Sequence, residues 1–238
     1  MITKNKLKIF NDPIYGFITI PNTLIFDLIE HKYFQRLRRI TQMGMSYLVY
    51  PGAHHTRFHH AIGCMHLMQK AVNVLRFKGV TISEPEKSAL FAAILLHDIG
   101  HLVLFKTLPE LSRKSLEYIL DDIDDVSLYL VEQEFIGFDH AMVGGALAEQ
   151  WHLTPMLVET ITAHHDLQKA SKFKKESAVV KIANSIAVMA ELDSTHIEET
   201  DAEVLTDEDW ACAGLDPDQA NSIMDKAVPF ARSAYKEV

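Results

Sequence analysis

An uninterrupted apolar run from Ala89 to Leu96 constrains the fold of this 238-residue chain more than any other feature. Ser83 and Glu86 precede the run with the spacing of a capping box, and Pro85 fits the first turn of a helix. A helix that is apolar on all sides has to be surrounded by other elements. The run is also far too short to span a bilayer. It therefore predicts a central, buried helix.

Helical patterns continue on both sides of this run and favour an all-α fold. Apolar residues follow His59 in steps of three and four, and Asp139 and Thr154 are capping residues in front of further helical patterns. We expect the other helices at residues 24–31, 32–40, 140–151, 175–191 and 217–235, the last of them bent near Pro229.

The two ends of the chain differ from this helical middle. Turn signals at residues 11–16 and a β-prone run at 17–20, closed by Pro21, predict an N-terminal arm or hairpin. Residues 194–209 are acidic and poorly patterned, which predicts a surface loop. We expect one domain over residues 1–238, with an arm at 1–22 and a C-terminal loop and helix at 194–238.

Composition excludes several classes of protein. Apolar residues make up 48% of the chain, which is enough for a substantial core. The net charge of −9 argues against a general nucleic-acid binder or a protein of anionic membranes. Two cysteines, Cys64 and Cys212, rule out a disulfide framework and favour a reducing compartment. The N-terminus lacks the apolar stretch of a signal peptide, so we expect a cytoplasmic protein.

Histidine is the unusual residue type, with 13 copies, and His97-Asp98 is its sharpest occurrence. The pair follows the most buried helix, where a carboxylate is costly unless it is paired or bound to a metal. Imidazole and carboxylate together suit zinc, iron or manganese. Taken alone, the dipeptide is better explained as a helix end with a capping aspartate.

The dipeptide does not stand alone, because His60, His140 and the pair His164-His165 also lie near predicted helix boundaries. Helix ends that carry ligands of the same kind can converge on one pocket, so we favour a metal site over coincidence. Cys64 lies one turn after His60 and could approach this site, but a buried structural thiol is the favoured interpretation.

This order of residues resembles the HD superfamily of metal-dependent phosphohydrolases. The first part of the chain is similar to its deoxynucleotide triphosphohydrolase type, in the segments 11–17, 34–40, 47–52, 56–60 and 97–101. The resemblance implies an HD-domain helical bundle, here with a short N-terminal β arm. It also implies His60, His97 and Asp98 as metal ligands, with Arg57 and His101 contacting the substrate phosphates.

Residues 95–192 resemble a different branch, the HDOD type, in the segments 95–104, 138–144, 151–155 and 163–165. HDOD modules are mainly signalling domains, and many lack a working metal site. Lys106 ends a segment that departs from the nucleotide-hydrolase pattern, and the large insert of that type is missing. Asn184 replaces the late aspartate of the superfamily and is a weaker, neutral ligand. A recombined chain or a divergent natural protein would both explain this two-part character.

A third branch, the HD-GYP phosphodiesterases, uses additional histidines to complete a two-metal site. By that resemblance His140, His164 and His165 would bind a second ion, with Asp98 bridging the two. The chain lacks the Gly-Tyr-Pro signature of that branch, so cyclic dinucleotides are not the favoured substrate.

The leading hypothesis is a metal-dependent phosphohydrolase that acts on a phosphate ester, preferably a nucleotide, with a metal-activated water. Its cofactor would be one or two divalent ions of Mn, Fe, Ni or Zn. The alternative is a non-catalytic, HDOD-like signalling module. We expect a phosphorylated small molecule as partner, no membrane and no nucleic acid, and a homo-oligomer is left open. The catalytic candidates are Arg57, Asp98 and His101, and the metal-ligand candidates are His60, His97, Asp98, His140, His164, His165 and Asn184.

Overall fold

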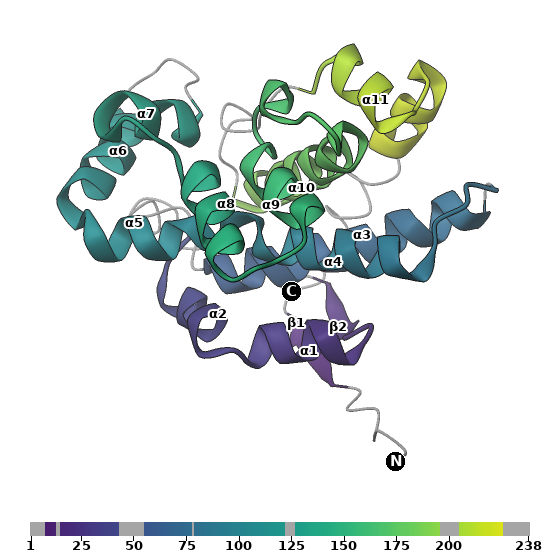
Figure 1. Cartoon of the computed structure of the whole chain (residues 1–238), viewed down its shortest axis with the longest axis horizontal. Coiled ribbons are helices and arrows are strands. Elements are labelled where there is room, and N and C mark those ends of the chain that lie inside the picture. The colour runs from purple at the N-terminus through teal and green to yellow at the C-terminus, as the bar shows by residue number, and fades with distance from the viewer. Residues whose placement is uncertain are drawn as a thin grey trace.

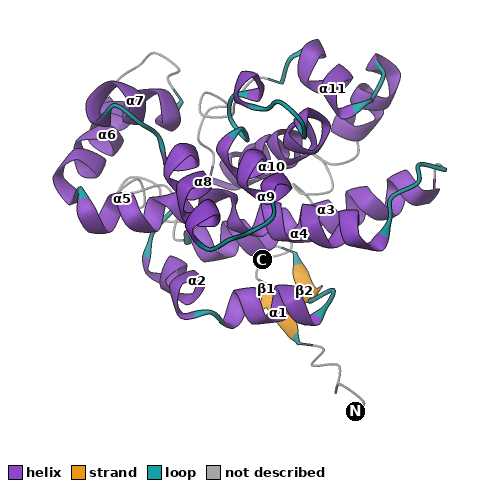
Figure 2. Ribbon diagram, in the orientation of Figure 1, coloured by secondary structure: helices purple, strands orange, loops and turns teal. Residues whose placement is uncertain are grey.

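The computed structural model describes residues 8–12, 15–42, 55–77, 79–121, 127–195 and 205–225. Over these ranges the chain consists of helices and their connections, with a single two-stranded hairpin (Figures 1 and 2). The predicted all-α fold with a short β arm is therefore confirmed.

The β arm lies below α3 and α4 in Figure 1, at the level of α1. Strand β1, Ile9–Asp12, pairs antiparallel with β2, Gly16–Thr19, with Ile9 opposite Thr19. Asp12 Oδ1 accepts a hydrogen bond from the Tyr15 amide, which fixes the entry into the second strand. Ile18 and Ile20 are buried, so side chains of the arm join the core.

Two short helices connect the arm to the core. Helix α1, Thr23–Glu30, is capped by the Asn22 side chain, and α2 covers Lys32–Arg36. The helix expected at 32–40 is shorter than predicted, because its last turn tightens into a 3-10 turn at Leu37–Arg39. The segment 47–52 and the loop predicted through Gly44, Pro51 and Gly52 lie outside the described residues.

The centre of the molecule is formed by α3, Arg57–Phe77, and α4, Glu84–Leu96, which pack on each other. The predicted capping box is present at the start of α4, where the Ser83 hydroxyl accepts from the Glu86 amide and the Glu86 carboxylate accepts from the Ser83 amide. Residues 90–96 are buried throughout. Figure 1 shows α4 crossing the middle of the molecule, as the all-apolar run predicts.

Helix α4 ends at Leu96, as the polar residues from His97 onward predict. Residues His97–Gly100 form a 3-10 turn, and the chain continues as α5, His101–Thr107, which the sequence analysis did not predict. The stretch Glu84–Thr107 is long and apolar enough to cross a membrane, but 72% of its most apolar window is buried inside the protein, as in a core helix.

The remaining helices cover this centre. Helix α10 packs on α3, α4, α9 and α11, and α8 packs on α9 and on the 3-10 turn His97–Gly100. Asp139 and Thr154 cap α8 and α9 through their side chains, as predicted. The bounds are α6, Pro109–Asp121; α7, Leu128–Ile136; α8, His140–Gln150; α9, Pro155–Thr162; α10, Lys174–Thr195; and α11, Asp207–Ala213.

The C-terminal part contains a helix, α11, that the sequence analysis did not predict. The acidic segment expected as a loop up to residue 209 already contains the first turn of α11. Thr206 and Asp209 form a capping box there, and Trp210 is buried behind it. The predicted final helix is described at 217–225, and its expected bend at Pro229 lies outside the described residues.

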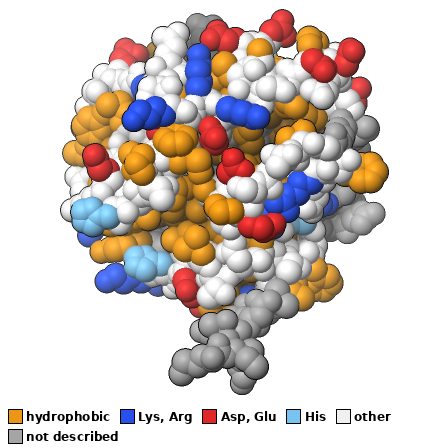
Figure 3. All heavy atoms as spheres, turned by 45° about the vertical axis from the view of Figure 1, so that its right-hand side comes forward, with side chains coloured by type: hydrophobic (Ala, Val, Ile, Leu, Met, Phe, Trp, Pro, Cys, Tyr) orange, Lys and Arg blue, Asp and Glu red, His pale blue; other side chains and the backbone are white. Residues whose placement is uncertain are grey.

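The surface carries no single dominant sign of charge on the face drawn in Figure 3. Lysine and arginine side chains alternate there with aspartate and glutamate, and apolar side chains lie between them. His60, His97, His140 and His164 are buried, so the candidate site lies in the interior.

Candidate metal centre

Five segments that are far apart in the sequence meet at one buried point. They are the first turns of α3, the 3-10 turn His97–Gly100, the start of α8, the turn after α9, and the middle of α10. The structure brings together every site residue that the sequence singled out: Arg57, His60, His97, Asp98, His101, His140, His164, His165 and Asn184. All but His165 are at most 6% exposed.

Glycines allow the backbones around this point to approach closely. A Cβ on Gly100 would lie 1.9 Å from the His140 carbonyl oxygen, and one on Gly144 would lie 2.9 Å from the Ile161 side chain. The 3-10 turn therefore touches the first turn of α8 directly. This contact places His97 and Asp98 beside His140.

The first group of side chains surrounds Nε2 of His60. That atom lies 3.3 Å from His97 Nε2 and 3.1 Å from Asn184 Oδ1. Asn184 Oδ1 is also 3.1 Å from His97 Nε2. His97 donates its Nδ1 proton to the Ile94 carbonyl at 2.6 Å, so its Nε2 presents a lone pair to Asn184. Nitrogen and oxygen lone pairs that face one another in this way suit a shared cation.

The second group is built from the later histidines. His140 Nε2 lies 2.9 Å from His165 Nε2, and the rings of His140 and His164 are 5.4 Å apart. His164 donates Nδ1–H to the Ile161 carbonyl at 2.7 Å. Its Nε2 is buried and has no hydrogen-bond partner. A buried nitrogen without a partner is costly, and a metal ion would satisfy it.

Asp98 stands between the two groups. Its Oδ1 is 3.5 Å from His97 Nε2 and 3.6 Å from His140 Nε2. Its Oδ2 accepts from Arg57 at 3.0 Å and lies 3.8 Å from His60 Nε2. Burial raises the pKa of this carboxyl, but the neighbouring charges, above all His97 and Arg57, hold it well below its usual range. Asp98 is therefore ionised and faces both groups.

Glu132 on α7 belongs to the site, and the sequence analysis missed it. Its Oε2 accepts from the backbone amide of His140 at 2.9 Å and from His140 Nδ1 at 2.6 Å. Burial lowers the pKa of His140, but the Glu132 carboxylate outweighs it and raises that pKa. The sequence of α7 gave little signal, because it contains two glutamates, Glu132 and Glu134, among largely apolar residues.

His101 also lies within the site, stacked on His140 with ring centroids 3.8 Å apart. Its Nε2 is 3.7 Å from Asp98 Oδ1, and its Nδ1 is 3.4 Å from Glu132 Oε1. Burial and the charge of Arg57 lower the pKa of His101 to about 3. The ring is neutral at physiological pH, which suits hydrogen bonding better than general acid catalysis.

The arrangement fits a divalent transition metal. His97, His140 and His164 are each fixed through Nδ1 by an acceptor on their outer side, which leaves Nε2 facing inward. This is the pattern of metal-ligating histidines in proteins. Nitrogen donors with one carboxylate and one amide oxygen suit zinc, iron, nickel or manganese.

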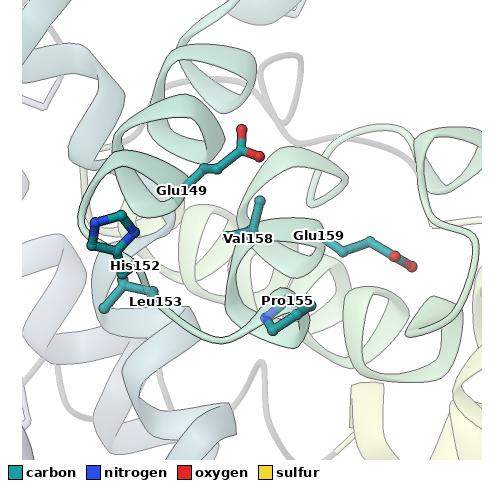
Figure 4. A pocket seen from close by; sticks show the side chains of 6 residues that line it. All are labelled: Glu149, His152, Leu153, Pro155, Val158 and Glu159. Carbon is teal, nitrogen blue, oxygen red and sulfur yellow. The ribbon is translucent and has the colours of Figure 1, made fainter.

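A surface pocket of about 470 Å³ lies apart from this cluster, between α8 and α9. Figure 4 shows its lining, with Glu149 and His152 on one side and Glu159 on the other. The Glu159 carboxylate already accepts hydrogen bonds from the backbone amides of Lys172 and Phe173. The pocket shares no residue with the histidine cluster.

Parts of the chain are similar to curated proteins. It is 42% identical over 95 residues to the uncharacterized protein YwfO of Bacillus subtilis, covering 40% of this chain and 22% of that protein. It is also 42% identical over 103 residues to the deoxynucleoside triphosphate triphosphohydrolase SAMHD1 of Danio rerio, covering 42% of this chain and 16% of that protein. The chain thus spans less than a quarter of the length of either relative.

A solved structure and a family model cover more of the chain. A hypothetical protein from Aquifex aeolicus has the same fold, with a TM-score of 0.51 and 21% identity over 95% of this chain and 58% of that one. A family model described as HDOD domain matches residues 39–167, which is more than half of the 238 residues. This range includes eight of the nine predicted site residues, all but Asn184. The chain belongs to the HDOD domain family.

Proposed function

We propose that this protein is a metal-dependent phosphohydrolase that acts on a phosphate ester, preferably of a nucleotide. The observation that carries the proposal is the position of Asp98, whose two oxygens face His97 and His140 on one side and Arg57 and His60 on the other. The similarity of part of the chain to a protein named as a deoxynucleoside triphosphate triphosphohydrolase supports the substrate class.

In this mechanism, one ion would be held by His60, His97, Asp98 and Asn184, and a second by Asp98, His140, His164 and His165. A bound divalent ion would lower the pKa of a ligated water and neutralise charge on the phosphate. Glu132 fixes the ring of His140 through Nδ1. The Ile94 and Ile161 carbonyls fix His97 and His164 in the same way.

Arg57 would bind substrate phosphate oxygens. Its NH1 donates to Asp98, while its Nε is buried and has no hydrogen-bond partner. An unused donor of a guanidinium is well suited to a phosphate oxygen. His101 would contribute an uncharged N–H donor next to Arg57, because its low pKa keeps the imidazole ring neutral near physiological pH.

The test is hydrolysis of nucleoside triphosphates and of a generic phosphodiester with Mn or Fe supplied. Asp98→Asn keeps the side-chain shape and removes the charge, so turnover should fall by more than about 10- to 100-fold, the usual cost of losing a supporting group at a metal site. Asp27→Ala, an exposed carboxylate on α1, is the control and should keep full activity. Equal turnover in Asp98→Asn and the parent would refute the mechanism.

One observation favours a second function, a non-catalytic signalling module. Asn184 places a neutral amide oxygen 3.1 Å from His60 and His97, where a carboxylate would bind a cation more strongly. A parent protein without activity under any of the metals would favour this second function.

A cytoplasmic location follows as a proposal from the cysteine content alone.

A further inference from the structure

We propose that Asp139 and Lys169 are a positioning pair, which sets the distance between the imidazole rings of His140 and His165. Asp139 caps α8 directly in front of His140. Lys169 ends the 3-10 turn Leu167–Lys169, four residues after His165. Lys169 Nζ donates a hydrogen bond to Asp139 Oδ2 at 2.9 Å. The inference rests on the second metal group of the proposed function, but not on hydrolysis.

Asp139 does more than the cap of a helix requires. A cap needs one side-chain oxygen, and at α9 the hydroxyl oxygen of Thr154 is sufficient. At α8 the capping atom is Asp139 Oδ1, which accepts from the Met142 amide at 2.7 Å. The other oxygen, Oδ2, accepts from Lys169 Nζ and from Gln133 Nε2. The second oxygen therefore connects α8 to two other segments.

The pair is largely removed from water. The side chain of Asp139 is 0% exposed, and that of Lys169 is 25% exposed. Burial raises the pKa of the Asp139 carboxyl, but its hydrogen bonds, first of all the one from Lys169, outweigh burial and lower that pKa. Asp139 is therefore ionised. Because a buried carboxylate without its cation is strongly destabilising, the distance between the two side chains can change little.

His165 is the site residue for which this tie matters most. It is partly exposed and lies in the bend between α9 and the 3-10 turn Leu167–Lys169, outside any helix. Its Nε2 is 2.9 Å from His140 Nε2, and the ring of Tyr129 stacks parallel to it at 4.7 Å. Stacking restrains the tilt of the ring. The ion pair with Lys169 ties the bend itself to α8.

The same carboxylate oxygen also reaches α7. Gln133 donates to Asp139 Oδ2, and the neighbouring Glu132 accepts from His140 Nδ1 at 2.6 Å. Helix α7, the start of α8 and the bend that carries His165 thus meet at one atom. Metal ligands have to be held within about 0.5 Å of their binding geometry, which is what bonds between supporting residues provide.

Two variants distinguish positioning from a simple effect of charge. Asp139→Asn keeps a capping residue and removes a negative charge, whereas Lys169→Met removes a positive charge. Positioning predicts that both variants weaken Zn²⁺ binding to the second metal group by more than about 10-fold. An effect of charge alone would weaken binding in Asp139→Asn and strengthen it in Lys169→Met. Changes in opposite directions would overturn the inference.

Isothermal titration of the metal-free full chain with Zn²⁺ measures these affinities, and the binding step that is lost in His164→Ala identifies the second group. Lys169→Arg should restore the affinity, because it restores the ion pair. Lys172→Met is the matched control, since it removes the same charge from an exposed side chain nearby and should bind like the parent. Urea denaturation checks that each variant is folded.

A second measurement needs no metal. The Nε2 atoms of His140 and His165 share a proton in the metal-free protein, and its NMR signal should be present in the parent and lost in Asp139→Asn. This variant leaves no unpaired buried charge, so it tests the pair even if Lys169→Met does not fold. An unchanged signal in Asp139→Asn would overturn the inference.

Failure of the proposed function gives a different result. Loss of the shared proton signal in Asp139→Asn, in a protein that neither binds metal nor hydrolyses phosphate esters, would support the positioning pair and count against the proposed function. Unchanged Zn²⁺ affinity in both variants of an active protein would overturn this inference alone.

Discussion

At the scale of single residues, the orientation of the imidazole rings distinguishes this cluster from an ordinary group of buried histidines. His97 and His164 bond their Nδ1 to backbone carbonyls, and His140 bonds its Nδ1 to Glu132. Burial lowers the pKa of His97, His164 and His165, so these rings are neutral near physiological pH. Neutral rings with Nε2 facing inward can bind a metal without first losing a proton.

Glu132→Gln should weaken metal binding by about 10- to 100-fold, because His140 loses the carboxylate that fixes its ring and raises its pKa. Glu134→Gln is the matched control, since Glu134 lies two residues away on α7 and is exposed. Isothermal titration of the metal-free proteins with Zn²⁺ or Mn²⁺ measures both. Equal affinities for the two variants would show that Glu132 does not act on the site.

His66 lies on α3 next to Tyr15, with ring centroids 5.5 Å apart, and its Nε2 is buried without a hydrogen-bond partner. Burial, followed by the charge of Lys70, lowers its pKa from 6.5 to about 4. Between these values the unfolded chain binds a proton that the folded protein does not. Above about pH 6.5 His66 is neutral in both states and does not lower the free energy of unfolding. As the pH drops from 6.5 towards 4, protonation of His66 in the unfolded chain lowers that free energy.

His66→Phe removes this group and should reduce the pH dependence of unfolding free energy between pH 6 and 4.5 by up to roughly one proton. Urea denaturation of the metal-free protein across this range measures the slope. The slope of the parent protein is the reference. An unaltered slope in His66→Phe would mean that the histidine titrates normally in the folded protein.

At the scale of elements, the site depends on the contact between the 3-10 turn His97–Gly100 and the first turn of α8. Gly100 has an ordinary helical backbone, so the need for glycine is steric and not conformational. A Cβ there would meet the His140 carbonyl oxygen at 1.9 Å and the Gly144 amide nitrogen at 2.8 Å. Backbone atoms inside a helix cannot move aside without shifting the whole element.

Gly100→Ala should destabilise the protein by about 2 to 3 kcal/mol or more and weaken metal binding, because α8 has to move away from His97. Gly145→Ala is the informative comparison. Its Cβ would also meet an atom at 1.9 Å, but that atom is the hydroxyl of Thr162, which can rotate. Urea denaturation should show the larger loss for Gly100→Ala. A larger loss for Gly145→Ala would contradict the role given to this contact.

At the scale of the whole molecule, sequence patterns predicted the hairpin, the central helix and its main neighbours, but not α5, α6, α7 and α11. The all-apolar run and its capping box predicted the central helix, because burial on every side leaves little freedom. The end of this helix at His97 was predicted, but the 3-10 turn and α5 beyond it were not. Helix α11 was missed because its acidic cap resembles a loop.

The residues that gather in the candidate site could be predicted, but not the residue that orients His140. His60, His97, His140 and His164 are recognisable because several histidines lie near helix boundaries in one chain, although one alone would be ordinary. Glu132 is not, because its role depends on α7 packing beside His140, a contact that no local pattern encodes.

The most direct test of the central claim is the metal content of the full chain purified without chelator. Inductively coupled plasma mass spectrometry should find near-stoichiometric zinc, iron, nickel or manganese in the parent, and much less in His97→Ala, which removes a nitrogen from the first group. A protein that is metal-free and also fails to take up any of these ions on dialysis would contradict the account.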